Sequence, residues 1–548
     1  MRTMQDAFIV FAVVFSILLL MLLDVWPPAI WILLIWLPFL LLGIYDIVQK
    51  KHTILRLYPV IGHIRFLFEA IRPEIQQYFV EDNTNGKPIS REFRSLVYQR
   101  AKGERDTIPF GTQFDVARVG YEWTNHSMFP VETMVEDPRV MFGEGRCRQP
   151  YCAALVNVSA MSYGALSPNA LRALNLGAKL GNFAHNTGEG GLSPYHLENG
   201  GDIVLQIGTG YFGCRTRDGH FDREKFMQNA CREAVKMIEI KLSQGAKPGH
   251  GGLLPGSKVN EEIAAIRGVE VGQDVVSPPM HTAFDSPIGL LEFIEDLRES
   301  TGKPVGFKLA VGRTDEFLAL CKAMLVTEIM PDFITVDGGE GGTGAAPVEF
   351  SNSMGTPLKE ALYVVHNSLV GCGLRDKTRI IASGKMLSAF HLFRALALGA
   401  DTVNSARGMM FALGCVQSLH CNTDKCPTGV ATQNPRRSNA LDVSTKSQRV
   451  ANYQSSVIYH FKQMLAAAGL KSTDEISASD VYRRVSETKV MALAEIYPVM
   501  EEGCLLDVKT VPEDWKAYWE KATPHYWSDK HIQAVVEEAV EHQVSEAG

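Results

Sequence analysis

The sequence predicts an α/β protein whose centre is a (β/α)8 barrel of the TIM type, with a transmembrane hairpin before it and a helical region after it. Three observations predict this fold. The N-terminus carries two apolar segments, residues 150 to about 410 alternate short β-rich runs with helical stretches, and the chain after 440 has helical patterns with charged faces. Parallel strands joined by crossover helices give such an alternation, and eight of them close a barrel.

Two uncharged stretches of 17 residues, Ala7–Leu23 and Ala29–Tyr45, predict the hairpin. Each is at the short end of what crosses the hydrocarbon of a bilayer. Asp24–Pro28 between them is long enough only for a tight turn, and it offers no small-residue cleavage site of the kind a signal peptide needs.

Basic residues flank the hairpin, with Arg2 before it and Lys50, Lys51 and Arg56 after it, whereas the turn carries only an acid. By the positive-inside rule, both ends then face the cytoplasm. We therefore expect a protein of the cell membrane with two transmembrane helices and its catalytic part in the cytoplasm.

Four segments follow from these patterns. They are a hairpin (1–50), a helical connector or docking segment (51–149), the barrel with a cysteine loop at 415–426 (150–440), and a helical C-terminal region (441–548). The net charge of −7 and the lack of a basic stripe argue against nucleic-acid binding.

Nine candidate strands lie in the barrel region, so one of them must lie outside an eight-stranded barrel. They are Ala154–Ala160, Asn182–Asn186, Ile203–Ile207, Met237–Leu242, Val275–Ser277, Val305–Leu309, Phe333–Val336, Ile380–Ser383 and Thr402–Ser405. The predicted helices between them include Pro168–Leu180, Ser286–Thr301, Asp315–Val326 and Ala389–Leu398.

Three cysteines, Cys415, Cys421 and Cys426, lie within twelve residues of one another. Converging thiolates favour an iron–sulfur cluster or zinc. A structural zinc needs a fourth ligand, for which His420 or Cys504 is a candidate. The spacing alone leaves the choice between the two metals open.

Glycine-rich loops follow several predicted strands. In barrels, the loops after the last two strands often bind a phosphate; here these are Ser383-Gly384-Lys385 and Ser405-Ala406-Arg407-Gly408. Two further segments fit G-x-G-x-x-G, at 208–213 and 339–344, but neither opens a convincing helix, so a dinucleotide site is a weak interpretation.

Four cations, Lys241, Lys247, Arg267 and Lys308, lie on or near predicted strand ends and glycine loops. A solvated cation is the ordinary interpretation of any one of them. Lys241 is different because it lies inside an apolar strand, and a buried lysine needs an anionic partner. A dicarboxylate or a flavin phosphate would serve.

Five motifs in one order give a wider resemblance. They are Ser159–Gly164, Asn186–Gly191, Lys241–Gly256, Gly341–Ala345 and Cys426–Gln433. Over about 150–435, this pattern resembles the FMN domain of the glutamate synthase family.

The resemblance implies an FMN-binding barrel beside a 3Fe-4S cluster. It implies Cys415, Cys421 and Cys426 as cluster ligands, Lys241 and Arg267 as carboxylate-binding residues, and Lys247 near the flavin as a third catalytic residue. It places Lys308 at the flavin ring. The remaining cofactor-binding residues that we expect are Ala160, Met161, Ser162, Gly342, Ser383, Gly384, Lys385, Arg407 and Gly408.

The activity that the resemblance implies is reduction of 2-iminoglutarate, formed from 2-oxoglutarate and ammonia, to glutamate. The electron donor or acceptor is open: ferredoxin, a reductase subunit or a quinone. In the loop over the substrate, His250 and Leu253 stand where the family usually has Glu and Gln. The family's N-terminal glutaminase uses an N-terminal catalytic cysteine, whereas the first cysteine here is Cys147, so that activity is not expected.

Two alternatives stay open. One is a membrane-bound flavin dehydrogenase that passes electrons from an amino or hydroxy acid to quinone, which the hairpin favours. The other is a non-catalytic electron-transfer subunit, against which Lys241 and Arg267 argue.

Overall fold

The computed structural model describes residues 4–104 and 107–528 and divides the chain into two compact units, 1–88 and 89–548. The first unit is helical. Its elements are α1 Met4–Val25, η1 Pro27–Ile32, α2 Leu33–Val48, α3 Thr53–Leu57, α4 Gly62–Ile75 and the π-helical turn η2 Gln76–Val80. The predicted pair of apolar helices is confirmed.

Trp36 of α2 holds the two apolar helices of the hairpin together. Its ring lies 4.3 Å from that of Phe15 and 5.8 Å from that of Phe11, and its Nε1 donates a hydrogen bond to Ser16 Oγ at 3.1 Å. The helices separate at Trp26, where Pro27 begins a 3-10 turn. By length and composition, each apolar arm can cross a membrane.

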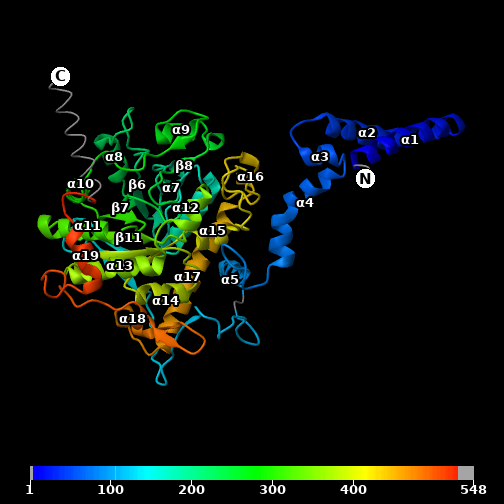
Figure 1. Ribbon diagram of the computed structural model, residues 1–548. Helices are drawn as coiled ribbons and strands as arrows, with labels where there is room; N and C mark the ends of the chain where they lie inside the picture. Colours follow the sequence, from blue (N-terminus) through cyan, green and yellow to red (C-terminus); the bar gives the residue numbers. More distant parts are fainter. Residues whose placement is uncertain (1–3, 105–106, 529–548) are drawn as a thin grey trace. The chain divides into compact units, whose positions relative to one another are not determined.

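The second unit contains a closed barrel of eight parallel strands, as predicted (Figure 1). In barrel order the strands are β4 Val156–Val158, β5 His185–Asn186, β6 Ile203–Ile207, β7 Val235–Lys241, β10 Val305–Leu309, β11 Phe333–Asp337, β12 Arg379–Ser383 and β13 Thr402–Ser405. The candidate strand outside the barrel is the one predicted at Val275–Ser277: it forms β9 Val275–Val276, which pairs antiparallel with β8 Leu253–Leu254.

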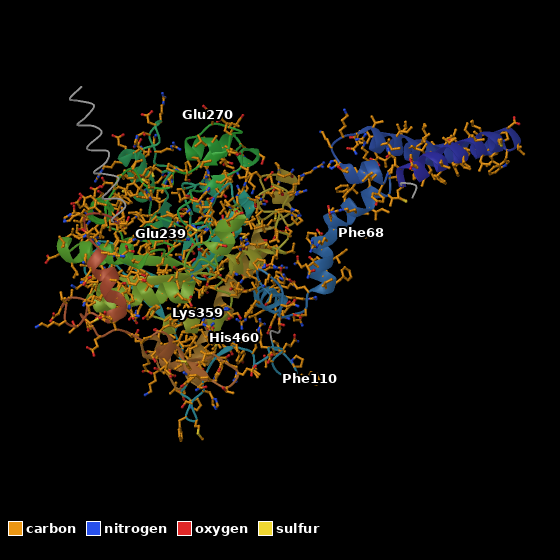
Figure 2. The ribbon with its side chains drawn as sticks, viewed as in Figure 1. Phe68, Phe110, Glu239, Glu270, Lys359 and His460 are labelled. Atoms are coloured by element: carbon orange, nitrogen blue, oxygen red, sulfur yellow. The ribbon has the colours of Figure 1, made fainter. Side chains whose placement is uncertain are left out.

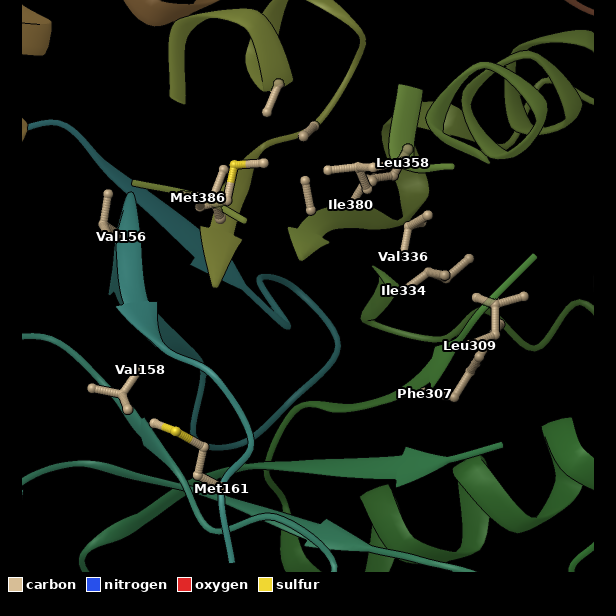
Figure 3. Packing of buried hydrophobic residues seen from close by; sticks show 14 of the residues in the cluster. Val156, Val158, Met161, Phe307, Leu309, Ile334, Val336, Leu358, Ile380 and Met386 are labelled. Atoms are coloured by element: carbon tan, nitrogen blue, oxygen red, sulfur yellow. The ribbon is translucent and has the colours of Figure 1, made fainter. Parts of the chain in front are cut away.

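Apolar side chains cover both faces of the barrel strands. Leu309 of β10 lies opposite Val336 of β11, and Figure 3 shows such side chains packed with one another. Strands buried on both faces carry apolar runs, as in Ile203-Val204-Leu205 of β6. A polar residue inside such a run is therefore costly unless it is paired.

The predicted helices form, and two of them have serine caps. They are α6 Pro168–Leu180, α10 Pro287–Thr301, α11 Thr314–Thr327 and α14 Ala389–Ala397. Ser167 and Ser286 cap α6 and α10, each accepting a hydrogen bond from a backbone N–H of the first turn, and a proline occupies the first position of both helices. The other helices of this region are α7 Pro194–Leu197, α8 Arg223–Ala230, α9 Glu261–Arg267, α12 Val348–Ser353, α13 Leu358–Gly371 and α15 Arg407–Leu413.

Segments on either side of the barrel add strands that the sequence did not predict. β1 Glu122–Thr124 pairs with β14 Val481–Arg484, which pairs with β15 Val490–Ala492. Another hairpin, β2 Arg139–Phe142 with β3 Tyr151–Ala154, packs Phe142 against Phe333 at the start of β11. Strands of three or four residues carry little local signal, and β1 is remote in sequence from its partner β14.

The described C-terminal region is otherwise helical. Its elements are α16 Pro435–Asn439, α17 Val443–Ala467, α18 Leu493–Ile496 and α19 Glu513–Lys521. α17 packs along α6 and α5 Arg91–Lys102, so it covers one side of the barrel. Short 3-10 turns complete the described elements: η3 Gly256–Lys258, η4 Arg375–Lys377, η5 Thr473–Glu475 and η6 Ala478–Asp480.

Candidate active site

The predicted site residues gather at one end of the barrel. Lys241 and Ser383 are the last residues of β7 and β12, Lys308 is next to last in β10, and Arg407 is the second residue after β13. Parallel strands bring their carboxyl ends to the same mouth, where barrel enzymes carry their active sites. Arg267 is an exception to the prediction, because it ends helix α9 and not a strand.

Lys241 finds its anionic partner within the protein. Its Nζ lies 2.9 Å from Glu189 Oε1 and donates a second hydrogen bond, of 2.8 Å, to Gln244 Oε1. Both charged side chains are largely buried. Burial acts to raise the pKa of Glu189, but the cations Lys241, Arg267 and Lys247 outweigh it and lower the pKa of this carboxyl below its ordinary value.

Arg267 is buried beside the same carboxylate. Its Nη2 donates to Ser162 Oγ at 3.2 Å and to the carbonyl of Tyr163 at 2.9 Å, and its guanidinium lies 5.2 Å from the ring of Phe212. Within the described part of the chain, its Nε has no hydrogen-bond partner. Burial lowers the pKa of Arg267 to about 10, although Glu189 opposes the shift.

Lys247 completes a group of four charges. It is 2% exposed, and burial lowers its pKa, with Lys241 adding to the effect and Glu189 opposing it. Lys241, Lys247 and Arg267 all interact with Glu189, so three cations surround one carboxylate. We call these four residues the cation cluster; its formal charge is +3 − 1 = +2.

A glycine-rich loop closes over the cation cluster. It leaves a cavity of about 10 Å³ lined by Glu189, Lys241 and His250 among others, which is room for about one water molecule. A Cβ at Gly252 would lie 2.3 Å from Glu189 Oε1, so a larger residue here would displace this carboxylate. His250 and Leu253, the two departures from the family pattern, are both exposed.

Lys308 lies in a different electrostatic setting. Its Nζ is 3.2 Å from Asp337 Oδ2, which also accepts a hydrogen bond from the N–H of Gly245 at 2.9 Å. Burial acts to lower the pKa of Lys308, but Asp337 and then Glu239 outweigh it, so the pKa is raised. Lys308 therefore stays charged.

Glu239, inside the barrel, is held by neutral donors. Its Oε1 accepts hydrogen bonds from Asn186 Nδ2 at 2.7 Å and Gln206 Nε2 at 2.6 Å, and its Oε2 accepts one from Thr335 Oγ1 at 2.6 Å. A buried carboxylate that is fully hydrogen-bonded is tolerated in a core, and this one lies beneath Lys308.

The predicted phosphate loops are neighbours. β12 and β13, which precede them, pair in parallel, and β13 pairs in turn with β4, which precedes Ala160, Met161 and Ser162. Lys385 has a left-handed backbone with φ of 52°. The predicted residue Gly408 packs against Tyr453 of α17, since a Cβ there would lie 2.3 Å from the tyrosine oxygen.

The loop at 341–344 links Arg407 to the cysteine segment. Arg407 Nη2 donates to the carbonyl of Thr343 at 3.4 Å, and a Cβ on Gly342 would lie 2.8 Å from the same nitrogen. A Cβ on Gly344 would contact Cys421 Cβ at 3.5 Å. The predicted phosphate and cysteine segments thus meet on either side of one short loop.

The three cysteines interact electrostatically but do not form a metal site. Burial, and after it Cys421 and Cys426, raise the pKa of Cys415 to about 11. Burial acts to raise the pKa of Cys426, but hydrogen bonds from backbone N–H groups, first that of Ala431, lower it overall. In residues 4–104 and 107–528, no three His, Cys, Asp or Glu side chains are arranged to hold a metal ion.

The two residues considered as a fourth ligand differ in position. His420 is exposed within the cysteine loop. Burial raises the pKa of Cys504, and the thiol of Cys372, directly after α13, adds most to this shift. Cys504 therefore belongs to a different part of the structure.

Sequence analysis missed Glu189, Asp337, Glu239 and His281 as functional candidates. Asp337 ends β11 and Glu189 follows β5, positions that in a barrel indicate a site residue. His281 is buried, with Nε2 2.9 Å from the carbonyl oxygen of Lys241 and Nδ1 3.1 Å from the Tyr211 hydroxyl. No sequence motif pointed to His281.

Comparison with known proteins finds relatives of this chain. The family model described as the conserved region in glutamate synthase matches residues 131–471. The glutamate synthase large subunit-like protein YerD of Bacillus subtilis is 40% identical over 489 residues, which is 82% of this chain and 93% of that protein.

Two further relatives cover less of the chain. The archaeal glutamate synthase (NADPH) of Methanocaldococcus jannaschii is 36% identical over 59% of this chain and 60% of its own length. The large chain of the glutamate synthase (NADPH) of Bacillus subtilis is 32% identical over 60% of this chain and 21% of its own length.

Proposed function

Because this chain belongs to the glutamate synthase family, and so is an oxidoreductase acting on CH–NH2 groups, we propose that it reduces 2-iminoglutarate to glutamate. The imine forms from 2-oxoglutarate and ammonia. The observation that carries this proposal is the cation cluster, whose formal charge of +2 matches a dicarboxylate dianion.

Each cation has a separate part in holding the substrate. The buried Nε–H of Arg267 has no hydrogen-bond acceptor among the described residues. A guanidinium group suits a carboxylate in shape and charge. Lys241 and Lys247 supply the remaining positive charge. Buried cations in excess over one carboxylate favour a second anion strongly, because low-dielectric surroundings strengthen the attraction.

Substrate entry requires the glycine-rich loop to open. The cavity of about 10 Å³ beside Lys241 and Glu189 is too small for a five-carbon dicarboxylate. Lys241 is engaged by Glu189 and Gln244, so a substrate carboxylate competes with them for the ammonium group. Closure of the loop over the bound substrate excludes water from the site.

FMN, when bound, supplies the hydride for the imine carbon. The residues present fit this cofactor: Lys385 and Arg407 are cations at the loops after the last two strands, and Gly342 lets the Arg407 guanidinium lie close to the backbone. Lys308 is a buried permanent cation of the kind that stabilises a reduced flavin ring. Ala160, Met161 and Ser162 line the same mouth after β4, and Ser383, Gly384 and Gly408 complete the proposed set.

A 3Fe-4S cluster on Cys415, Cys421 and Cys426 supplies one-electron transfer in this proposal. Cys421 and Cys426 lie close enough to Cys415 to influence its pKa, which supports ligation of one centre by the three thiols. The electron partner in this proposal belongs to one of three classes: a ferredoxin, a reductase subunit or a quinone.

Cys421→Ser tests the cluster directly. We expect the oxidised wild-type protein to give a three-iron electron paramagnetic resonance signal and the variant to lose it while it retains FMN, because none of the proposed FMN contacts is a thiol. Zinc in place of iron in the wild-type protein would make the centre structural and remove the proposed electron route.

The hairpin supports attachment to the cell membrane with the barrel in the cytoplasm. Lys50, Lys51 and Arg56 follow the second helix; Arg2, the other basic residue used for orientation, lies outside the described residues. Full-length protein should sediment with membranes until detergent is added. Recovery in the cytosolic fraction without detergent would contradict this proposal.

The hairpin also favours a second candidate function, oxidation of an amino or hydroxy acid with transfer of electrons to membrane quinone. Anaerobic reduction of the purified protein, followed by separate additions of 2-oxoglutarate, 2-oxoglutarate with ammonia, and a soluble quinone, separates the two. We expect flavin reoxidation and glutamate only with 2-oxoglutarate and ammonia together. Reoxidation by quinone alone would favour the second function, and no reoxidation by any of them would favour a non-catalytic subunit.

A further inference from the structure

The helix α4, which follows the hairpin, has an apolar face without a protein partner among the described residues of its own unit. Its apolar side chains recur at intervals of three or four residues along one side. They are Ile64, Leu67, Phe68, Ile71 and Ile75. Such a stripe normally faces a protein core, yet all five side chains here are between 37% and 59% exposed.

The apolar surface continues beyond the end of the helix. In η2, Tyr78, Phe79 and Val80 are also exposed, Phe79 at 85%. Figure 2 labels Phe68 on α4, where its side chain projects from the ribbon. A contiguous exposed apolar surface of this kind marks a contact with another protein or with a membrane.

The opposite side of α4 already has a partner. Phe66, two residues before Phe68, has its ring 5.6 Å from that of His52, directly before α3. Phe66 and Phe68 therefore leave the helix on different sides. The face that carries Phe66 packs within the N-terminal unit, and the face that carries Phe68 remains uncovered there.

Hydrogen bonds fix the start of α4 at the base of the hairpin. Asp46, in the last turn of α2, is fully buried. It accepts a hydrogen bond from the N–H of Val60 at 2.8 Å and lies 3.0 Å from His63 Nε2. α4 thus begins at the point where the second apolar helix ends.

The charges on α4 are balanced. Arg65 and Arg72 are offset by Glu69 and Glu74, and Arg65 Nε donates to Glu69 Oε1 at 2.9 Å on the polar side. With no net charge, attraction to anionic lipid headgroups contributes little. The contact that this helix makes depends on its apolar area.

We propose that α4 and η2 lie in the membrane interface, with the apolar face of α4 embedded in the bilayer and the polar face towards water. This inference rests on the proposed membrane hairpin. An amphipathic helix attached to the base of a membrane span buries its apolar face at the headgroup and acyl boundary. α4 then sets where the chain leaves the membrane for the catalytic unit.

A pair of photoreactive residues on the same helix tests this arrangement. A benzophenone amino acid replaces Phe68 in one full-length protein and Phe66 in another, and each is reconstituted into phosphatidylcholine vesicles and irradiated. We expect a lipid adduct from the protein labelled at position 68 and none from the protein labelled at position 66. Addition of phosphatidylserine should not change the yield, because the helix has no net charge.

Other outcomes overturn the inference. An adduct from position 68 to the catalytic unit or to a second copy would make the face a protein contact, and equal lipid labelling at both positions would mean that α4 has no fixed orientation. If the protein sediments with the vesicles but position 68 labels no lipid, this inference fails and the hairpin proposal stands. If the protein does not associate with vesicles, the hairpin proposal itself fails.

Phe68→Glu provides a second readout. The hairpin should keep this variant on the vesicles, whereas α4 should leave the interface and become open to proteolysis between residues 62 and 80. Phe66→Glu should disturb the contact with His52 without this specific exposure. Equal protease sensitivity of Phe68→Glu and the wild-type protein would contradict the inference.

Discussion

Lys241 and Lys308 are buried lysines at the same mouth of the barrel, directly opposite each other in the pairing of β7 with β10, but their surroundings are reversed. Lys241 is one of three cations around the single carboxylate of Glu189. Lys308 is one cation influenced by three carboxylates, first Asp337, then Glu239 and last Glu189. The same residue type therefore serves two purposes on adjacent strands.

This difference indicates which part of the mouth receives an anion. The side of Lys241 has positive charge in excess over the one carboxylate of Glu189. Carboxylates of the protein raise the pKa of Lys308, so this lysine stays charged. We therefore expect the proposed substrate, with its charge of −2, to bind beside β7 and not beside β10.

The largest expected effect comes from removing Lys308, the lysine that is paired with a buried carboxylate. Lys308→Ala leaves Asp337 buried without its cation, and breaking a buried ion pair from one side costs ~3–5 kcal/mol of unfolding free energy. Chemical denaturation of the detergent-solubilised protein measures it. Lys308→Met combined with Asp337→Asn is the matched control, because it leaves no unpaired charge and should cost much less.

The outcome also tests the reversed settings of the two lysines. Glu239 keeps its three neutral donors in both variants, so it does not account for the difference between them. Equal destabilisation by the single and the double substitution would mean that Asp337 is stabilised by other groups. The contrast between the two lysines would then be wrong.

Lys241→Ala should act on ligand affinity more than on the fold. Glu189 still has Arg267 and Lys247 nearby, so the variant leaves no isolated buried anion. The loss of one hydrogen-bonded charge weakens 2-oxoglutarate binding by ~1.5–3 kcal/mol. Calorimetric titration measures this change, and the flavin spectrum should show that FMN is retained.

Lys258→Ala is the control for removing a buried lysine elsewhere. Lys258 Nζ donates to the carbonyls of Cys421 at 2.8 Å and Ala431 at 3.1 Å, which places it at the cysteine loop. It should leave dicarboxylate affinity unchanged. If Lys241→Ala binds 2-oxoglutarate normally and loses FMN, the cation cluster belongs to the cofactor and the substrate site lies elsewhere.

Sequence alone predicted the elements that local patterns specify. β6 Ile203–Ile207 and α6 Pro168–Leu180 match the predicted ranges, because an apolar run and a serine cap before proline are local signals. Lys241 was also predictable, since a cation within Ile238–Leu242 demands a partner. The identity of that partner was not predictable, because Glu189 is 52 residues away and reaches Lys241 only when the barrel closes.

Long-range pairing explains the other omissions. β1 and β14 are separated by more than 350 residues, so no local pattern predicts their contact. The cysteines show the opposite case: their spacing predicted a shared centre, but within the described residues they remain three interacting thiols without metal-binding geometry. Proximity in sequence placed them in one loop, and a bound cluster would have to complete the arrangement.

A smaller effect should come from pH, through the histidine that supports β7. His281 is buried, and burial lowers its pKa to about 4, while an unfolded histidine titrates near 6.5. Below pH 6.5, His281 binds a proton in the unfolded chain but not in the folded chain. The free energy of unfolding therefore falls as pH falls from 6.5 towards 4. Between pH 7 and pH 5 this one group should remove ~1–2 kcal/mol of unfolding free energy.

His281→Asn isolates this contribution from that of the other buried histidines. The variant should be less stable at pH 7, because the contacts to the Lys241 carbonyl and the Tyr211 hydroxyl are disturbed, but its stability should fall less between pH 7 and pH 5. His420→Asn, at an exposed position, should keep the wild-type dependence. In the described structure, Lys308 is stabilised by carboxylates and not by a buried histidine. If the stability of His281→Asn depends on pH as that of the wild-type protein does, this difference between β7 and β10 is wrong.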